Sequence, residues 1–368
     1  MGLLIDVFWG VVCSLSRKKS WCGHRWVGFS LNKREAFGVN DRRMSFAVTG
    51  AYGWIGRRVC AWLALQHFET RRIAATEVEP GVFPWDCTQA EESMELNAGL
   101  KGCDVVIHCA GRAHRPVESV EEKRLFQEVN VEGTRRLVNA CLQVGVPRIV
   151  YVSTSAVYQW GGDSLRKEDH VIDRMTAYAK SKYDGELIIE QSGLDWRIAR
   201  LATVFGDGDR ANFLKLAKGI RSRRFFVPGR GDSRKSVLPV GRAAELLCRY
   251  SLLASPLHRI VNLASPDPPT LREICDAFSM ECGFAQVKSL PLQLMKAIAG
   301  VGDIIRILGL QFPLDSGTLR KLTTSTVLDT TRQAALFPEL GWTSFREQLS
   351  ECADYYRNST ASPNSKRI

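Results

Sequence analysis

The chain has 368 residues, with 50 Lys and Arg against 39 Asp and Glu, and a formal net charge of +11. Hydrophobic residues make up 45% of it and charged residues 24%, which excludes a disordered or collagen-like chain. The length exceeds a peptide-sized module and suffices for one large α/β unit or two packed lobes. The basic excess alone leaves open nucleic-acid binding, an anionic surface, a phosphate-bearing small ligand, or solubility.

The first 43 residues differ from the rest of the chain. They hold eight Lys/Arg and three Asp/Glu, so nearly half of the net positive charge lies there. Their apolar run at 2–15 is interrupted by Asp6, falls short of the roughly 20 residues that span a bilayer, and precedes the basic residues, unlike a signal peptide. We expect 1–43 to be a disordered leader or a start-site artefact, with Met44 opening the domain; an interfacial anchor is the alternative.

From Met44 the sequence alternates strand-like and helix-like segments. In chain order we expect a strand at 46–49, a helix at 54–66, a strand at 72–76, a helix at 90–100, a strand at 104–109, a long helix at 121–144, a strand at 148–153, a helix at 177–191 and a strand at 196–199. This alternation predicts an α/β fold, a Rossmann-type doubly wound parallel sheet with helices on both faces. Ligands of such sheets bind at the carboxyl ends of the strands.

Two further features along the chain have competing interpretations. Residues 290–312 are apolar with interspersed charges, which predicts either an amphipathic helix capping a substrate lobe or a membrane-surface patch; we favour the cap. His108, inside an apolar strand, is expected to be a core histidine. The eleven cysteines stand singly, without CxxC pairs or metal spacing, which predicts a reduced, cytoplasmic protein with no disulfide framework and no metal site.

A glycine turn, TGAYGWIG, follows the first strand and opens the first helix. Gly50 permits the tight turn, Gly53 lets the backbone approach a pyrophosphate, and Gly56 lets helix and strand pack closely. Trp54 and Ile55, at the helix N-terminus, are assigned to the same site. The turn predicts dinucleotide binding, although such glycines also occur for structural reasons alone.

Two carboxylates are candidates for the adenosine end of a dinucleotide. Glu77 follows the second strand, where it could accept hydrogen bonds from the ribose and would repel a 2′-phosphate, which favours NAD over NADP. A solvated loop carboxylate with Glu79 beside it is the alternative. Asp86, after the short apolar run 82–85, could accept a hydrogen bond from the adenine amino group.

Tyr178 and Lys182 stand four residues apart on one face of a helix, near its start. A nearby ammonium favours the phenolate and would lower the pKa of Tyr178 from about 10 toward a value useful to a general base. The hydroxyl-rich segment YVSTSAVY at 151–158 ends a central strand and is aimed at the same edge of the sheet. Together these segments predict a proton-transfer site.

Six motifs in order, TGAYGWIG, CDVVIHCAGRAH, NVEGT, VSTSAVY, YAKSK and RLATVFGDG, resemble the extended short-chain dehydrogenase/reductase family, specifically its NAD-dependent nucleotide-sugar epimerase/dehydratase branch. The match runs from Met44 to about Tyr355. The resemblance implies a Rossmann cofactor domain at 44–205 to which 237–263 returns, a substrate-binding domain at 206–236 and 264–356, a tail at 357–368, and often a homodimer.

The resemblance also implies roles for individual residues. Tyr178 would be the catalytic tyrosine, Lys182 would bind the nicotinamide ribose and tune that tyrosine, and Thr154 would be the catalytic hydroxyl. Ala110 and Gly111 would form the backbone strip beside NAD, while Gly50, Gly53 and Gly56 would be the pyrophosphate glycines.

Asn212 would contact the nucleotide diphosphate of the substrate, and Arg234 or Lys235 would bind phosphate; the sequence does not rank this pair. Ser155 and Ala156 occupy the positions where the family's 4,6-dehydratases carry an Asp-Glu pair, which argues against dehydration.

The resemblance implies an NAD-dependent nucleotide-sugar epimerase that oxidises C4 of a UDP-sugar and reduces it again, in polysaccharide biosynthesis. A ketoreductase or hydroxysteroid-type dehydrogenase of the same family is one alternative, and a non-catalytic binding protein is another. No nucleic-acid partner and no firm membrane contact are expected. Outside the leader, part of the basic charge clusters at 221–224 and 230–235, near the expected diphosphate.

Overall fold

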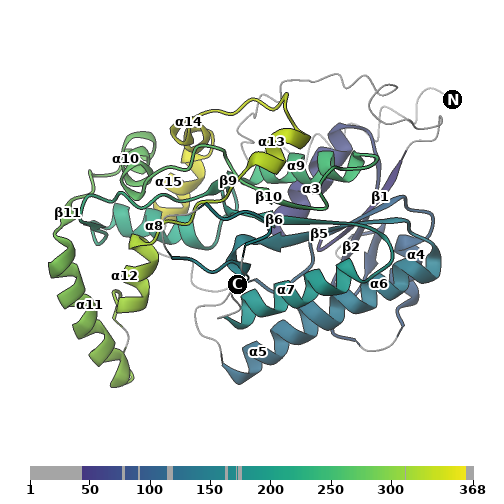
Figure 1. Cartoon of the computed structure of the whole chain (residues 1–368), viewed down its shortest axis with the longest axis horizontal. Coiled ribbons are helices and arrows are strands. Elements are labelled where there is room, and N and C mark those ends of the chain that lie inside the picture. Colours follow the sequence, from purple (N-terminus) through teal and green to yellow (C-terminus); the bar gives the residue numbers. More distant parts are fainter. Residues whose placement is uncertain are drawn as a thin grey trace. The chain divides into compact units, whose positions relative to one another are not determined.

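The computed structural model describes residues 44–76, 79–89, 92–113, 119–161, 165–170, 172, 176–310 and 312–361. Contacts divide the chain into two units, 1–31 and 32–368, and the described residues belong to the second. Their centre is a seven-stranded sheet in the order β10-β6-β5-β4-β1-β2-β3, with every neighbouring pair parallel (Figure 1). The strands are β1 Ser45–Thr49, β2 Glu69–Ala74, β3 Val82–Pro84, β4 Val105–His108, β5 Arg148–Thr154, β6 Asp195–Leu201 and β10 Ile260–Leu263. The predicted Rossmann-type fold is confirmed.

Helices cover both faces of this sheet because successive strand residues point to opposite sides. Phe46 and Val48 of β1 join the core under α3 and α9, whereas Ala47 between them joins the core under α4, α6 and α7. These helices span Trp54–Leu65 (α3), Met94–Leu100 (α4), Gly133–Val144 (α6), Ala177–Glu190 (α7) and Val240–Leu252 (α9).

The long helix expected at 121–144 is divided by a π-helical turn. It consists of α5 (Val120–Phe126), the π-turn Gln127–Glu132 and α6. The helix expected at 90–100 begins at Met94, because the Ser93 side chain accepts a hydrogen bond from the Leu96 N–H and so caps the helix there. Both differences are local. The structure also adds a short strand, β3, between β2 and α4, which the expected order lacks.

A second core lies in the C-terminal part of the chain. Aromatic rings of Phe205, Phe213, Phe278, Phe345 and Tyr356 pack together in it. Its helices are α8 Asn212–Arg221, α10 Leu271–Cys282, α14 Phe345–Ser350 and α15 Ala353–Ala361. Two short parallel strand pairs lie in the same part of the chain. In the first, β7 (Thr203–Phe205) pairs with β9 (Val237–Pro239), and in the second, β8 (Val227–Pro228) pairs with β11 (Ser289–Leu290). The remaining helices are α11 Leu292–Ile307, α12 Ser316–Thr323 and α13 Thr331–Leu336. A separate core is consistent with a substrate-binding lobe, whose expected boundaries stay a prediction.

Candidate active site

The glycine turn forms a tight backbone cradle between β1 and α3. Gly50 has a φ of +63°, and a Cβ on it would lie 2.7 Å from the backbone of Ala110. A Cβ on Gly56 would collide with the Gly50 carbonyl oxygen. Gly53 is exposed and caps α3 without any side-chain hydrogen bond, and the first turn of α3 holds no acidic residue. The first N–H groups of α3 therefore remain open to an anion.

Trp54 and Ile55 open α3 at this cradle, so their backbone N–H groups are the parts that face an anion there. The Trp54 side chain is used elsewhere, because its indole Nε1 donates to the Asp207 carbonyl oxygen at 2.6 Å. A Cβ on Gly208 would lie 2.9 Å from the same indole ring. Trp54 thus fixes the start of α3 against the loop that leads into the C-terminal lobe.

A buried histidine holds the strand end behind the cradle. His108 is 2% exposed; its Nδ1 lies 2.6 Å from Thr49 Oγ1, and its Nε2 lies 3.1 Å from Thr134 Oγ1. Thr49 Oγ1 in turn accepts the Ala110 N–H at 3.2 Å. Burial lowers the pKa of His108 to about 3, so it is neutral, with both ring nitrogens satisfied. His108 is the core histidine that the sequence predicts, and it also anchors Ala110.

Asn130 fastens the next residues of the strip to helix α7. Its Oδ1 accepts the Arg112 N–H at 2.7 Å, while its Nδ2 donates to the Arg112 carbonyl oxygen at 3.1 Å and to Ser181 Oγ at 2.9 Å. Gly111 is exposed, and a Cβ on it would lie 3.1 Å from Asn130 Oδ1 and 3.8 Å from Lys182 Nζ. The cofactor strip therefore runs beside the candidate catalytic lysine.

Tyr178 and Thr154 meet at the carboxyl edge of the sheet. Thr154 ends β5, and its Oγ1 accepts the Ala156 N–H at 3.2 Å, which leaves its own hydrogen free to donate. The Thr154 side chain is close enough to the Tyr178 hydroxyl to lower the pKa of Tyr178 against the effect of burial. Ser155 and Ala156 form the 3-10 turn that follows, so the structure brings the hydroxyl pair together without a carboxylate at those two positions.

The electrostatics of this pair differ from the expectation. Burial raises the pKa of Tyr178, and the opposing contribution comes from the Thr154 hydrogen bond. The ammonium of Lys182 lies 4.1 Å from the centre of the Tyr151 ring, and burial lowers the pKa of Lys182 to about 8. The prediction that Lys182 lowers the pKa of Tyr178 is therefore wrong in this geometry.

A buried ion pair lies one helical turn further along α7. Glu186 is fully buried and Arg200 is 3% exposed; Arg200 Nη2 donates to Glu186 Oε2 at 2.6 Å and Arg200 Nε to Oε1 at 3.0 Å. Ser153, next to Thr154 on β5, also donates to Glu186. The Glu186 charge raises the pKa of Lys182 against the effect of burial. This pair connects β5, β6 and α7 directly beneath the candidate catalytic residues.

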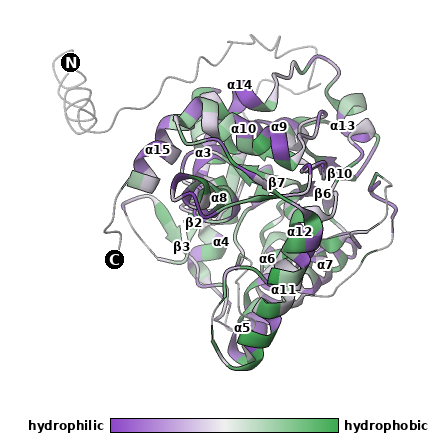
Figure 2. Ribbon diagram, turned by 90° about the vertical axis from the view of Figure 1, so that its left-hand side faces the viewer, coloured by the Kyte–Doolittle hydropathy of each residue, from purple (hydrophilic) through white to green (hydrophobic). Residues whose placement is uncertain are grey.

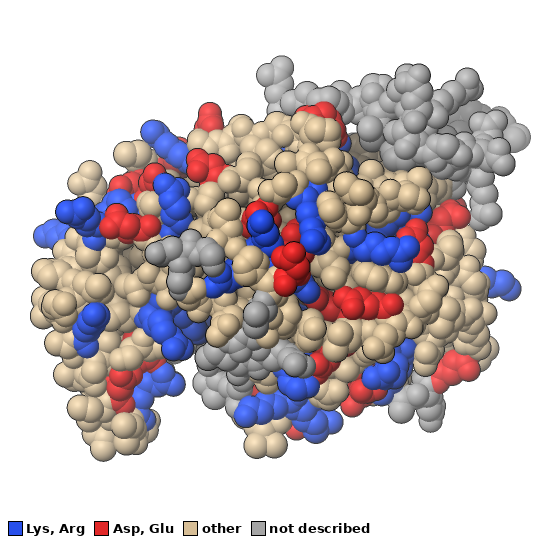
Figure 3. Space-filling model, in the orientation of Figure 1, with Lys and Arg blue, Asp and Glu red and all other residues tan. Residues whose placement is uncertain are grey.

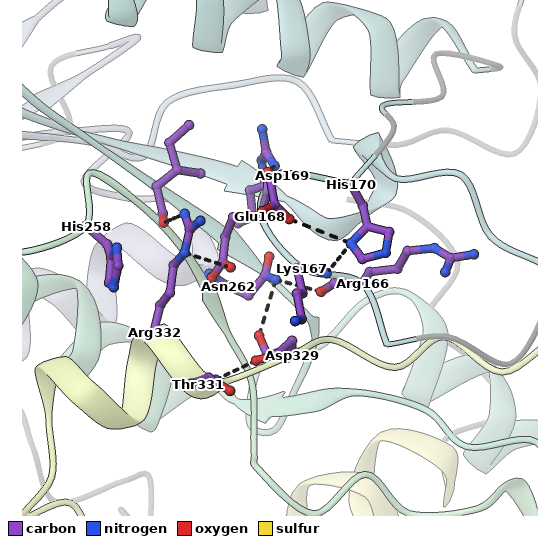
Figure 4. A network of polar contacts seen from close by, with 12 residues as sticks. Arg166, Lys167, Glu168, Asp169, His170, His258, Asn262, Asp329, Thr331 and Arg332 are labelled. Carbon is purple, nitrogen blue, oxygen red and sulfur yellow. Dashed lines mark hydrogen bonds and ion pairs between the residues drawn. The ribbon is translucent and has the colours of Figure 1, made fainter.

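A polar network continues from Arg200, whose Nη1 donates to the Glu168 carbonyl oxygen at 2.8 Å. Figure 4 shows the part of this network around Glu168, Asn262 and Arg332. Asn262 on β10 donates from its backbone to Glu168 Oε1 at 2.8 Å and from its side chain to the Arg166 carbonyl oxygen at 2.9 Å. Arg332 of α13 approaches Glu168 Oε2 at 3.3 Å. The network fastens the segment after β5 to the sheet edge and to α13.

The two candidate adenosine carboxylates stay predictions. Asp86 accepts from both the N–H and the hydroxyl of Thr88, at 2.9 and 2.8 Å, so one of its oxygens is used in a local turn. Glu77 lies outside the described residues. Glu79 instead accepts from the Tyr52 hydroxyl of the glycine turn at 2.6 Å and pairs with Arg72.

The candidate substrate residues are distinguished by their partners. Lys235 donates to the Lys321 carbonyl oxygen at 2.9 Å and to that of Thr324, so it caps the end of α12, and burial lowers its pKa to about 8. Arg234 is exposed and donates one Nη1 hydrogen bond, at 2.9 Å, to the Pro268 carbonyl oxygen. Asn212 is exposed at the start of α8. Arg234 is the better phosphate candidate of the pair.

Sequence reasoning missed Asn130, Thr134 and the Glu186–Arg200 pair as parts of the site. Asn130 and Thr134 lie within the NVEGT motif, so the motif itself was the available signal. Glu186 gave a weaker signal, because it stands on the Tyr178 and Lys182 side of α7 at the same four-residue spacing.

A doubly wound parallel sheet with a glycine turn after its first strand and a Thr/Tyr/Lys set at its carboxyl edge defines an extended short-chain dehydrogenase/reductase. Within that class, the chain belongs to the NAD dependent epimerase/dehydratase family, whose sequence model matches residues 46–249. The chain is thus an enzyme of this family, and the expected cofactor, NAD, is the family's cofactor.

Two curated relatives are similar over parts of the chain. N-acetyl-alpha-D-glucosaminyl-diphospho-ditrans,octacis-undecaprenol 4-epimerase of Escherichia coli O157:H7 is 29% identical over 216 residues, 55% of this chain and 61% of the relative. This chain therefore matches less than two thirds of that relative's length. 4-Hydroxy-2-methyl-3-oxo-4-farnesyl-3,4-dihydroquinoline-1-oxide ketoreductase of Stigmatella aurantiaca is 28% identical over 272 residues, 70% of this chain and 79% of the relative.

Among solved structures, the UDP-glucose 4-epimerase of Thermus thermophilus in complex with NAD has a TM-score of 0.64 and 23% identity. The similarity covers 85% of this chain and 99% of the other. At this level of identity, the similarity demonstrates the shared fold.

Proposed function

We propose that this protein is an NAD-dependent epimerase that inverts the C4 hydroxyl of a sugar joined to a nucleoside diphosphate, in polysaccharide biosynthesis. The observation that carries the proposal is the proximity of the Tyr178 and Thr154 side chains at the end of β5, with Lys182 one helical turn further on and close to Gly111. The E. coli relative, named as a 4-epimerase, supports the same reaction type.

The chain's own residues fit NAD. Backbone fills the space where side chains on Gly50 and Gly56 would lie, and the uncapped start of α3 offers N–H groups to a pyrophosphate. Bound NAD would supply the acceptor and donor of hydride. Ala110 and Gly111, fixed by His108 and Asn130, would line its nicotinamide half.

Tyr178 would take the proton of the sugar hydroxyl and return it to the inverted alcohol. Thr154 would donate to the same oxygen, because its own oxygen already accepts the Ala156 N–H. The Lys182 ammonium, close to Gly111, would bind the ribose of the nicotinamide half. These roles follow the resemblance of the Thr/Tyr/Lys set and its geometry in the structure.

For the substrate we propose a UDP-sugar, with Arg234 and Asn212 at its diphosphate. Arg234 is exposed and uses one guanidinium nitrogen on the Pro268 carbonyl, which leaves further donors for phosphate oxygens. The expected homodimer and cytoplasmic location stay predictions.

A ketoreductase is the second candidate. Burial raises the pKa of Tyr178, so the phenol is ready to donate a proton to a carbonyl oxygen. The S. aurantiaca relative, named as a ketoreductase, also matches a larger share of the chain than the E. coli epimerase does. A ketoreductase would consume added NADH in proportion to product.

The test is to incubate the purified full chain with a panel of UDP- and dTDP-sugars, with and without NADH, and to follow products by NMR. Formation of a 4-epimer without added cofactor supports the proposal, and turnover only with stoichiometric NADH supports the ketoreductase. Tyr355→Phe, which removes a hydroxyl that donates to the Asp209 carbonyl oxygen in the C-terminal lobe, is the matched control for Tyr178→Phe. If no nucleotide sugar reacts while NAD is bound, the substrate assignment is wrong.

A further inference from the structure

Helix α11 has one side packed into the protein and another uncovered by the described residues. Met295, Ala299 and Gly302 form its buried side, packed with Leu319 of α12 and with Leu314. Figures 1 and 2 both place α12 alongside it. Large apolar side chains that are 49–84% exposed lie elsewhere on the helix and in the turn after it: Leu294, Val301, Ile304, Ile307, Leu308 and Leu310.

This apolar surface extends around the end of the helix. At about 100° per residue, Val301, Ile304 and Leu308 fall within about 60° of one another, opposite the buried side, whereas Ile307 lies about 120° from Val301. Leu310 continues the exposed surface beyond the helix.

Both carboxylates of the α11–α12 pair are used within it. Asp315 accepts the Thr318 N–H at 2.6 Å as the cap of α12 and pairs with Arg306. Asp303 accepts the Ser316 N–H at 3.1 Å. The segment 292–323 holds four basic residues against these two carboxylates, so its net charge is positive.

Four exposed cations lie on α11, on α12 and just before β11: Lys288, Lys296, Arg320 and Lys321. Within the described part of the chain, none of the four forms an ion pair with a carboxylate. Figure 3 shows Lys and Arg side chains on the side of the molecule where Figure 1 draws α11 and α12. Basic residues beside exposed apolar ones are typical of helices that lie on anionic lipid.

We propose that the exposed side of α11, together with the turn 308–310, docks on an anionic membrane surface. A second copy of the chain fits less well, because a two-fold interface would bring the same four cations against one another. With 16 residues, α11 is about 24 Å long, and none of the described helices has the length and apolar content to cross a membrane. Docking would therefore place α11 along the headgroups, contrary to the expectation of no firm membrane contact.

Sedimentation of the full chain with vesicles tests this proposal. We expect binding to phosphatidylcholine vesicles that contain about one third phosphatidylglycerol, weaker binding to phosphatidylcholine alone, and loss of binding as salt rises. The double substitution Ile307→Ser with Leu308→Ser should lower the partition coefficient about tenfold or more. Leu257→Ser with Met280→Ser, at sites 78% and 60% exposed on other elements, is the matched control and should change it little.

Two results would overturn the proposal. One is absent binding to the anionic vesicles, or binding that the Ile307/Leu308 substitutions leave unchanged. The other is a dimer in light scattering that the same substitutions convert to a monomer, which would assign this surface to a second copy of the chain. Turnover of water-soluble substrates by the same preparations is measured separately, so failure of docking is distinguishable from failure of the proposed function.

Discussion

The buried pair of Glu186 and Arg200 yields the most quantitative prediction. Glu186 is fully buried, receives two nitrogens of Arg200 at 2.6 and 3.0 Å, and also accepts the Ser153 hydroxyl. Replacing it by Gln removes the negative charge and leaves the guanidinium buried, with its Nη1 donating to Tyr158 and to the Glu168 carbonyl oxygen.

Removing one partner of a buried pair costs about 3–5 kcal/mol, because the other charge stays buried without compensation. A Gln carbonyl oxygen can still accept one of the Arg200 hydrogen bonds, so Glu186→Gln should lower the free energy of unfolding by about 3 kcal/mol, at the lower end of that range. Urea unfolding followed by circular dichroism measures this change. The slope of the free energy of unfolding against urea concentration should be the same in both proteins, which makes the comparison valid.

The matched control is Glu121→Gln. Glu121 pairs with Arg124 at 2.9 Å, but both side chains are about 60% exposed, so its loss should change the free energy of unfolding far less than the loss of Glu186 does. If Glu186→Gln lowers the free energy of unfolding no more than Glu121→Gln does, the buried pair does not stabilise the structure beneath the candidate catalytic residues as argued.

Three further predictions concern the surroundings of the site. Burial lowers the pKa of His108 to about 3, whereas its value in the unfolded chain is 6.5, so the unfolded state binds more protons than the folded state as the pH falls. His108 should therefore lower the free energy of unfolding by about 2 kcal/mol between pH 7.5 and pH 5. In unfolding titrations His108→Asn should remove that part of the slope, and an unchanged slope would contradict the assignment. Gly185→Ala should lower the free energy of unfolding by about 1–3 kcal/mol and remove most of the activity, because a Cβ there would lie 2.9 Å from the ring of Tyr151, over which the candidate catalytic Lys182 lies. Gly300→Ala, in open space on α11, should be neutral or slightly stabilising in the same thermal melts. Equal effects of the two substitutions would refute the argument. In steady-state kinetics Arg234→Ala should raise KM for the nucleotide sugar about tenfold. Lys235→Ala should leave KM unchanged and lower the free energy of unfolding by about 1–2 kcal/mol, because it removes the cap of α12. The opposite pattern would show that Lys235, not Arg234, binds the phosphate.

The fold and the glycine turn could be predicted because their signals are local. Alternating strand and helix patterns fix the order of elements, and Gly50, Gly53 and Gly56 lie within seven residues. The π-turn could not be predicted from helical periodicity, since it inserts no unusual residue. Its consequence, Asn130 reaching Arg112 and Ser181, depends on contacts across 18 and 51 residues.

The partners of charged side chains were the least predictable part of the site. Arg234 and Lys235 are adjacent, and in an extended segment neighbouring side chains point to opposite sides, which is why one caps α12 and the other is exposed. The sequence predicts a lowered pKa for Tyr178 from the spacing of Lys182, but the pKa depends on where the ammonium lies, and that is over Tyr151.

The most direct test of the central claim uses a UDP-sugar with deuterium at C4 and the purified chain without added cofactor. If the enzyme oxidises C4 and reduces it again within one site, the 4-epimer forms and keeps the deuterium, and Tyr178→Phe slows its formation by about 10²–10⁴-fold. Loss of deuterium to solvent, or a Tyr178→Phe variant as fast as the Tyr355→Phe control, would contradict the account.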